Sequence, residues 1–318
     1  MSSPFRSIVV TTALTGLLAA CGGQQPPQNG KPMTPEAAKA AATIALRDLS
    51  LGSSLVRGPS GIVPQSAAEA GLNARVLGGL EGLGIPMWQA LEAGCEVKVE
   101  PLPFTDKDAD LVPAGATLKV DCALDHNGYS YAFKGALRVE DNDDNFKDSG
   151  FRLSFQGFSD KATKGDYSVE RSFDGSFALD SKNPALYKLD KNYVLITKQT
   201  KAGQTNTLGA TFDTTETYAP DDPSKPVLAG DFAVDKVKPG TLTVQKNADV
   251  YNWNWYTDPT LHYTLSCVAV TGEGVWIPFD EGAVVYTYSD SKGQSANLRL
   301  EFTGCGSYTL TLDGKVIN

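Results

Sequence analysis

Apolar and polar residues alternate with a period of two over most of the chain from residue 96 onward. Successive side chains of a β-strand point to opposite faces, so this alternation predicts strands with one buried face. The alternating segments are 96–102, 116–125, 129–140, 151–158, 167–173, 176–179, 187–198, 205–217, 229–237, 241–246, 250–256, 261–270, 283–289, 296–302 and 307–312. Turn-forming pairs separate many of them, among them Asn127-Gly128, Asp174-Gly175 and Asp313-Gly314.

No helix-length segment interrupts this series, which excludes the β-α-β units of a parallel sheet. We therefore expect a mainly β protein whose region 95–318 is a large antiparallel meander of about 12 to 15 strands. A sheet this wide is expected to curve into a half-barrel or to split into two layers.

Two short helices are expected before the strands, in segment 34–94. Thr34-Pro35-Glu36 has the composition of a helix start and opens an Ala-rich run that reaches Leu49. Ser66 to Glu69 forms a capping box ahead of Leu and Val residues at helical spacing. These helices would cover one concave face of the sheet.

The N-terminus has the pattern of an export signal. Residues 1–20 combine one Arg with an apolar stretch and end in small residues, and Leu18-Ala19-Ala20-Cys21 follows. This motif resembles the lipobox of bacterial lipoproteins. The resemblance implies cleavage after residue 20, acyl chains such as palmitate on Cys21, and a lipid-anchored protein of the cell envelope. Gly22 favours the outer membrane, and residues 21–33 have the composition of a flexible tether. An ordinary secretory signal is the alternative.

Composition narrows the possible partners. The chain has 318 residues, of which 41% are hydrophobic and 20% charged, and its net charge is −9. These values exclude a disordered protein, and an acidic chain without a basic cluster argues against a nucleic-acid partner. With Cys21 assigned to lipid, four cysteines remain, and we expect the disulfides Cys95–Cys122 and Cys267–Cys305.

The two histidines, His126 and His262, are candidate ligands of copper or zinc, with Asp125 as a further ligand. Exported, acidic, disulfide-bonded β proteins that use copper to dismutate superoxide are similar in these respects. That family holds its copper with four histidines in an H-x-H pattern, which this chain lacks. A histidine without a metal-binding role is the alternative reading for each position.

Two acidic segments are candidate calcium sites, because calcium prefers closely spaced oxygen ligands. The first contains Asp106, Asp108 and Asp110, and the second runs from Glu140 to Asn145 with Asp141 and Asp143 as the candidate ligands. Neither continues as an EF-hand. Solvated hairpin loops are the alternative.

The segment 251–256 places Tyr251, Trp253 and Trp255 on one face of a strand. Such a face packs in a core or contacts a ligand or partner.

No nucleophile elbow, phosphate loop or zinc-protease motif is present in the sequence. The sequence thus favours a non-catalytic envelope lipoprotein that binds or scaffolds an envelope or surface-layer protein. One alternative is a carrier of a lipophilic ligand, since helices over a curved sheet resemble the half-barrel lipoprotein carriers. The other is a copper-dependent enzyme of the superoxide dismutase type.

Overall fold

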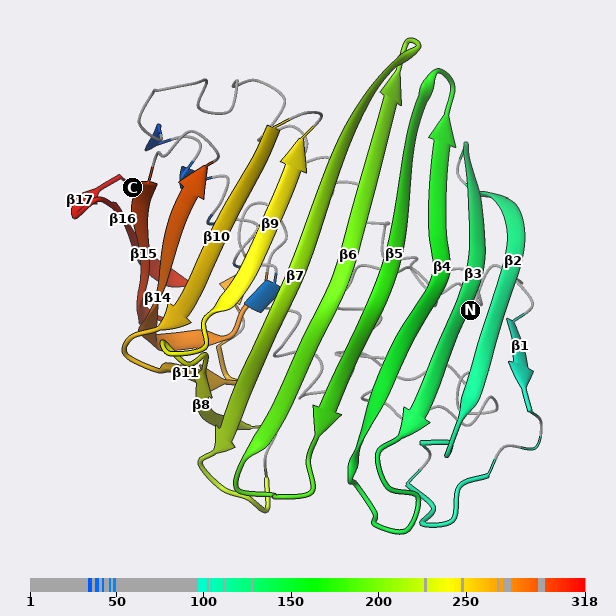
Figure 1. Ribbon diagram of the computed structural model, residues 1–318, viewed down its shortest axis with the longest axis horizontal. Coiled ribbons are helices and arrows are strands. Elements are labelled where there is room, and N and C mark those ends of the chain that lie inside the picture. Colours follow the sequence, from blue (N-terminus) through cyan, green and yellow to red (C-terminus); the bar gives the residue numbers. More distant parts are fainter. Residues whose placement is uncertain are drawn as a thin grey trace, which may run out of the picture.

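The described part of the chain forms one very wide antiparallel sheet (Figure 1). The computed structural model describes residues 34, 35, 38, 39, 42, 46, 48 and 49, and residues 97–317 apart from 102, 104, 111, 127, 226–227, 247–248, 268, 271–275 and 291–294. Fifteen strands belong to the large sheet, and two more form a separate ribbon. The expectation of a mainly β protein with one large antiparallel sheet is confirmed.

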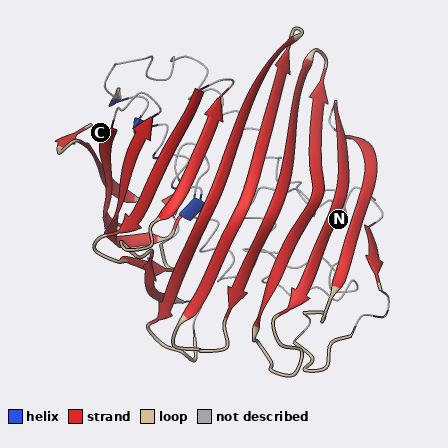
Figure 2. Cartoon of the chain, viewed as in Figure 1, coloured by secondary structure: helices blue, strands red, loops and turns tan. Residues whose placement is uncertain are grey.

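Strands account for nearly all regular structure in the described residues (Figure 2). They are β1 (Val97–Glu100), β2 (Ala116–His126), β3 (Tyr129–Asp141), β4 (Gly150–Lys164), β5 (Tyr167–Asp180), β6 (Tyr187–Lys201), β7 (Gln204–Pro220), β8 (Ala229–Ala233), β9 (Gly240–Lys246), β10 (Asp249–Thr257), β11 (Leu261–Thr264), β12 (Ala269–Val270), β13 (Trp276–Ile277), β14 (Phe279–Asp290), β15 (Ser295–Gly304), β16 (Ser307–Leu312) and β17 (Lys315–Val316).

Strands β1 to β7 pair in chain order, and the sheet then divides along two routes between β7 and β14. One route runs through β9 and β10, and the other through β8 and β11. On β7, Leu208–Asp213 pair with β9 and Thr217–Pro220 pair with β8, so residues 214–216 lie at the point of division. We call this place the fork.

One face of the sheet is buried and aromatic. Phe155 of β4 contacts Phe173 and Phe177 of β5, and Tyr193 of β6 stacks on Phe212 of β7 at 4.4 Å between ring centroids. The N-terminal residues Ala38, Ala42, Leu46 and Leu49 belong to the same buried cluster. The N-terminal segment therefore covers part of this inner face.

The described residues of segment 34–49 have helical backbone conformation from Pro35 onward, and the Ala38 N–H donates to the Thr34 carbonyl at 3.0 Å. No continuous helix is described there, and the second expected helix lies outside the described residues, so both helices stay predictions. In the part of the chain that the structure describes, no helix combines the length and apolar character needed to cross a membrane.

Asp174-Gly175, which the sequence predicts as a turn, lies inside strand β5 instead. Gly175 has φ +113°, and a Cβ there would lie 2.3 Å from the Asn192 carbonyl oxygen of β6. The neighbouring strands β3 and β4 are also irregular at this level of the sheet. The β3–β4 and β4–β5 registers shift beside Gly135 and Gly157. Bulges and glycines of this kind bend a sheet. Asp174-Gly175 therefore marks a bend within β5 and not a turn between two strands.

Replacement of Gly175 by alanine is expected to lower the free energy of unfolding by about 3 to 5 kcal/mol, because strain at positive φ adds to the clash with β6. Gly157→Ala is the matched control: Gly157 has φ +56° but open space around its Cβ position. It should cost only about 1 to 2 kcal/mol. Urea unfolding of the two variants measures both values, and equal losses would contradict the close packing of β5 on β6.

Candidate functional site: an acidic corner built from two loops

The two acidic segments meet at one corner of the sheet. The first lies in the loop between β1 and β2, and the second covers the last two residues of β3 and the start of the loop between β3 and β4. The Lys107 N–H donates to Asp144 at 2.9 Å, and the Asp148 N–H donates to Asp110 at 3.1 Å. Each loop thus donates a backbone hydrogen bond to an aspartate of the other.

Five aspartates gather at this junction, which we call the acidic corner: Asp106, Asp108, Asp110, Asp141 and Asp144. They form two groups of three, Asp106 with Asp108 and Asp144, and Asp108 with Asp110 and Asp141. Within each group the carboxylate oxygens lie within 4.8 Å of one another, and Asp108 belongs to both.

Some of these oxygens are buried without a hydrogen-bond donor. Asp108 Oδ2 and Asp141 Oδ2 are inaccessible to solvent and accept no hydrogen bond. Asp141 Oδ1, by contrast, accepts from the Ser149 hydroxyl at 2.7 Å and from the Asp143 N–H at 3.0 Å. Each carboxylate is thus held by one oxygen while the other faces its acidic neighbours.

The electrostatics match this crowding. Burial raises the pKa of Asp108 and of Asp110 above the ordinary range, and the nearby charge of Asp141 adds to the effect in both. Asp144 Oδ2 is compensated by Lys107 Nζ at 3.3 Å. A divalent cation would relieve the remaining repulsion, and several carboxylate oxygens at this spacing are what Ca²⁺ prefers.

The sequence predicted four of these residues, together with one that lies elsewhere. Asp143 is not in either group: its Oδ2 accepts from Lys182 Nζ at 2.6 Å, and this hydrogen bond lowers the pKa of Asp143. Asp144 takes its place. Alternation of side chains around a loop does not show which of two adjacent aspartates turns inward, and only the contact between the loops decides it.

The two histidines do not come together. His126 ends β2 and His262 lies in β11, with strands β3 to β8 between them in the sheet. Asp125 is engaged elsewhere, accepting from the Ser130 hydroxyl at 2.5 Å. The wide sheet therefore keeps the strand of His126 and Asp125 apart from the strand of His262, and a metal site at either histidine stays a prediction.

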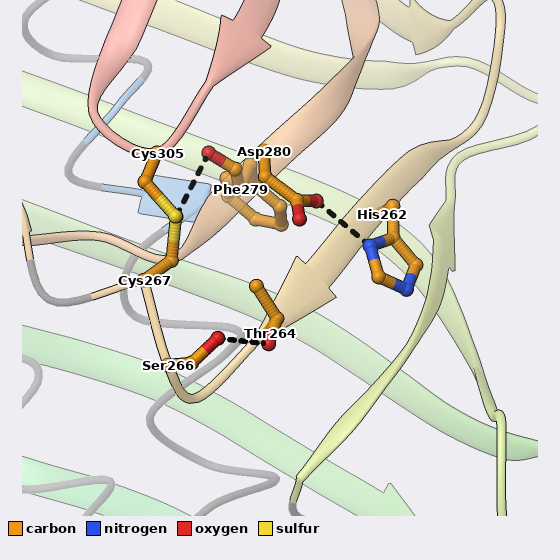
Figure 3. Close-up of a disulfide and its surroundings, with 7 residues drawn as sticks. All are labelled: His262, Thr264, Ser266, Cys267, Phe279, Asp280 and Cys305. Atoms are coloured by element: carbon orange, nitrogen blue, oxygen red, sulfur yellow. Dashed lines mark hydrogen bonds and ion pairs between the residues drawn. A yellow bond between two sulfur atoms is a disulfide. The ribbon is translucent and has the colours of Figure 1, made fainter.

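His262 lies between two other carboxylates. Its Nδ1 is 2.7 Å from Asp280 Oδ1 (Figure 3). Its Nε2 is 3.3 Å from Asp221 Oδ2, in the loop after β7. Partial burial by itself would lower the pKa of His262, but the hydrogen bonds to Asp280 and Asp221 outweigh it and raise the pKa above 6.5. When it is protonated, the ring therefore joins three separate segments: β11, β14 and the loop after β7.

The Cys267–Cys305 disulfide is present, with 5.0 Å between the Cα atoms (Figure 3). It joins the segment after β11 to the turn between β15 and β16. Cys122 is also disulfide-bonded. Its expected partner Cys95 and the expected lipidated Cys21 lie outside the described residues.

The aromatic face of β10 is part of the core. Trp253 and Trp255 are 7% and 2% exposed, and they pack against Tyr288 and Tyr286 of β14. The side chain of Tyr251 lies outside the described residues. Of the two interpretations that the sequence leaves open for this face, packing in a core describes the two tryptophans, because both indoles are buried on the inner face.

The sequence reasoning missed a second charged cluster, formed by Asp48, Lys191 and Glu216 beneath the fork. The available signal was that Lys191 falls on the apolar face of its strand, two residues after Leu189 and two before Tyr193.

Comparison of the chain with protein-family models, with curated proteins and with solved structures finds no match.

Calcium is expected to stabilise the protein through the acidic corner. After treatment with a chelator, added Ca²⁺ should raise the melting temperature, by the equivalent of about 2.7 kcal/mol once its concentration reaches 100 times Kd. Asp108→Asn, which removes the carboxylate shared by both groups, should abolish most of this rise. Asp143→Asn is the matched control and should retain it. A melting temperature that ignores Ca²⁺, or an equal loss in the two variants, would contradict the site.

The His262 contacts predict a pH dependence of stability. Because the folded protein holds the imidazole proton more tightly than the unfolded chain, the contribution is fully present below the ordinary pKa and is lost as pH rises through the raised one. His262→Gln should flatten the stability profile over about pH 6 to 8. Urea unfolding across this range measures the difference between the variant and the wild type. Two parallel profiles would show that the imidazolium does not hold these strands.

Proposed function

We propose that this protein is a lipid-anchored component of the cell envelope that binds or scaffolds an envelope or surface-layer protein. The Leu18-Ala19-Ala20-Cys21 motif and the polar tether after it support the anchor and the outer membrane as its site. Two or three acyl chains on one cysteine hold a protein far more firmly than a single chain does.

The burial of the described inner-face side chains is the observation that carries the choice of a scaffold over a carrier. A half-barrel carrier needs space between the sheet and the elements that cover it. Here the described inner-face rings contact one another from β4 to β7 and from β10 to β14, and Ala38, Ala42, Leu46 and Leu49 pack into the same cluster. A packed interior of this kind favours a rigid body.

The opposite face of the sheet is polar and exposed. A row of mostly uncharged hydrogen-bonding side chains crosses it in register from β5 to β15: Ser176, Asn192, Asp213, Thr241, Asn254, Thr287 and Asn297. The acidic corner lies at the β1–β4 end of the same sheet. Under this proposal, calcium at the corner stabilises the scaffold and performs no chemistry.

Purification from the native envelope in mild detergent tests the proposal. The protein should carry acyl chains on Cys21 and should migrate in a complex larger than its own mass together with a defined envelope protein. Cys21→Ser should abolish acylation and release the protein from the membrane fraction, while its fold, measured by circular dichroism, stays unchanged.

Other outcomes would reject the proposal. One lipophilic molecule per chain without a protein partner would favour the carrier. About one copper per chain, lost in the double variant His126→Ala/His262→Ala, would favour the metal enzyme. Absence of acyl chains from the wild-type protein would contradict the anchor.

A further inference from the structure

Beneath the fork, one fully buried lysine lies between two buried carboxylates from distant parts of the chain. Lys191 Nζ is 2.9 Å from Asp48 Oδ2 and 3.3 Å from the Asp48 carbonyl oxygen, and it also contacts Glu216 Oε1. The side chains of Lys191, Asp48 and Glu216 are 0%, 5% and 1% exposed. Asp48 is 143 residues before Lys191 in the chain.

The surroundings of this cluster exclude water. Trp255, Tyr193 and Tyr286 are all buried, and Lys191 Nζ lies 6.0 Å from the centre of the Trp255 ring. Close packing continues at Gly240, where an added Cβ would lie 2.5 Å from the Trp255 indole nitrogen. Charges in such a place are costly unless they are fully compensated.

The carboxyl group of Glu216 is only partly compensated by hydrogen bonds and charges. Glu216 Oε2 is buried and accepts no hydrogen bond. The nearby Thr214 Oγ1 is also buried and has no hydrogen-bond partner. This is a consequence of the fork, because residues 214–216 of β7 have no strand partner on that side.

The proton count of the cluster allows an uncharged state. Burial raises the pKa of Glu216 to about 8, against the opposing effect of Lys191, so Glu216 holds a proton at neutral pH. The pKa of Lys191 is also raised, since the attraction of Asp48 and Glu216 outweighs the effect of burial. Glu216 as a carboxylic acid and Lys191 as an ammonium group therefore supply two protons that can be redistributed in the cluster. Moving one of them from Lys191 to Asp48 leaves an amine and two carboxylic acids, with no charge in a dry site.

We propose that Lys191 and Asp48 form an intramolecular amide bond between their side chains. The Lys191 amine attacks the Asp48 carboxyl carbon, a C–N bond forms, the C–OH bond breaks, and one water molecule leaves. The amine gives up one of its two hydrogens as a proton, the amide nitrogen keeps the other, and the leaving hydroxyl takes up one proton to become water. Atoms and charge balance without an oxidant, a nucleotide or a metal.

Neighbouring groups suit the steps of this condensation. The Tyr193 hydroxyl donates to Asp48 Oδ1 at 3.2 Å, and so polarises the carboxyl and stabilises negative charge on that oxygen during attack. Glu216, in contact with Nζ, accepts a proton from nitrogen and delivers one to the leaving oxygen. Held groups of this kind reach effective concentrations of about 10⁵ to 10⁸ M.

Asp48 is favoured over Glu216 as the acyl partner for two reasons. Nζ contacts two oxygens of Asp48, and only the Asp48 carboxyl receives the additional donor Tyr193. The product also removes the buried ion pair and leaves one neutral acid, which lowers the cost of the site. The bond would join the N-terminal segment covalently to β6, whether or not Cys21 is acylated.

Mass spectrometry of the reduced, alkylated and denatured full chain tests the bond. The wild-type mass should be lower by one water than the sequence mass calculated for the same processed and alkylated chain. After trypsin, peptide 48–57 should be found linked to peptide 189–198, with no cleavage at Lys191. Lys191→Arg keeps the charge but should restore the full mass, and Glu216→Gln should slow or prevent the loss of water. Lys188→Arg, an exposed position on the same strand, is the matched control and should lose water as the wild type does.

The wild-type measurement decides the matter even where a variant fails to fold. A wild-type chain with the full sequence mass, cleaved normally at Lys191, would overturn the proposal. A link from Lys191 to peptide 202–236, which contains Glu216, would overturn the assignment of Asp48.

Discussion

The ammonium group of Lys191 lies where water cannot reach it. The position of the N-terminal segment depends on the carboxylates that compensate this buried charge. A buried cation requires close carboxylates, and the chain supplies one from β7 and one from a segment 143 residues away. Asp48 thereby fixes the part of the N-terminal segment that adds Leu46 and Leu49 to the core. The interaction thus links the described part of the covering segment to the middle of the sheet.

The fork explains why the charged cluster occurs at this place. A long strand such as β7 normally pairs along its whole length, but here two short pairs of strands replace one long hairpin. Between them Thr214 and Glu216 face an interior that neither β8 nor β9 fills, and the indole of Trp255 closes the space from β10. Among the C-terminal strands, the Cys267–Cys305 disulfide and the hydrogen bonds of His262 hold the chain together. Different interactions therefore stabilise different parts of this very wide sheet.

The sequence predicted the strands well because one face of the sheet is buried, which imposes a period of two. It failed at Asp174-Gly175, because local turn chemistry cannot show that a glycine lies beneath a neighbouring strand. The aspartates of the acidic corner were visible as two separate loops, whereas their meeting, and the inward position of Asp144, depend on tertiary structure. Lys191 stands on an apolar face in the sequence, but its partner Asp48 is too distant for any pattern to indicate.

A double-mutant cycle between Asp48 and Lys191 tests the central claim most directly, with stability measured by urea unfolding. Lys191→Met and Asp48→Leu should each cost about 3 to 5 kcal/mol, because each takes one partner from a buried charged group. The double variant Asp48→Leu/Lys191→Met should be much less destabilised than the sum of the two single variants. This result is expected whether the two side chains form an ion pair or an amide. Additive losses would contradict the account, because they would mean that Lys191 does not hold the N-terminal segment on the sheet.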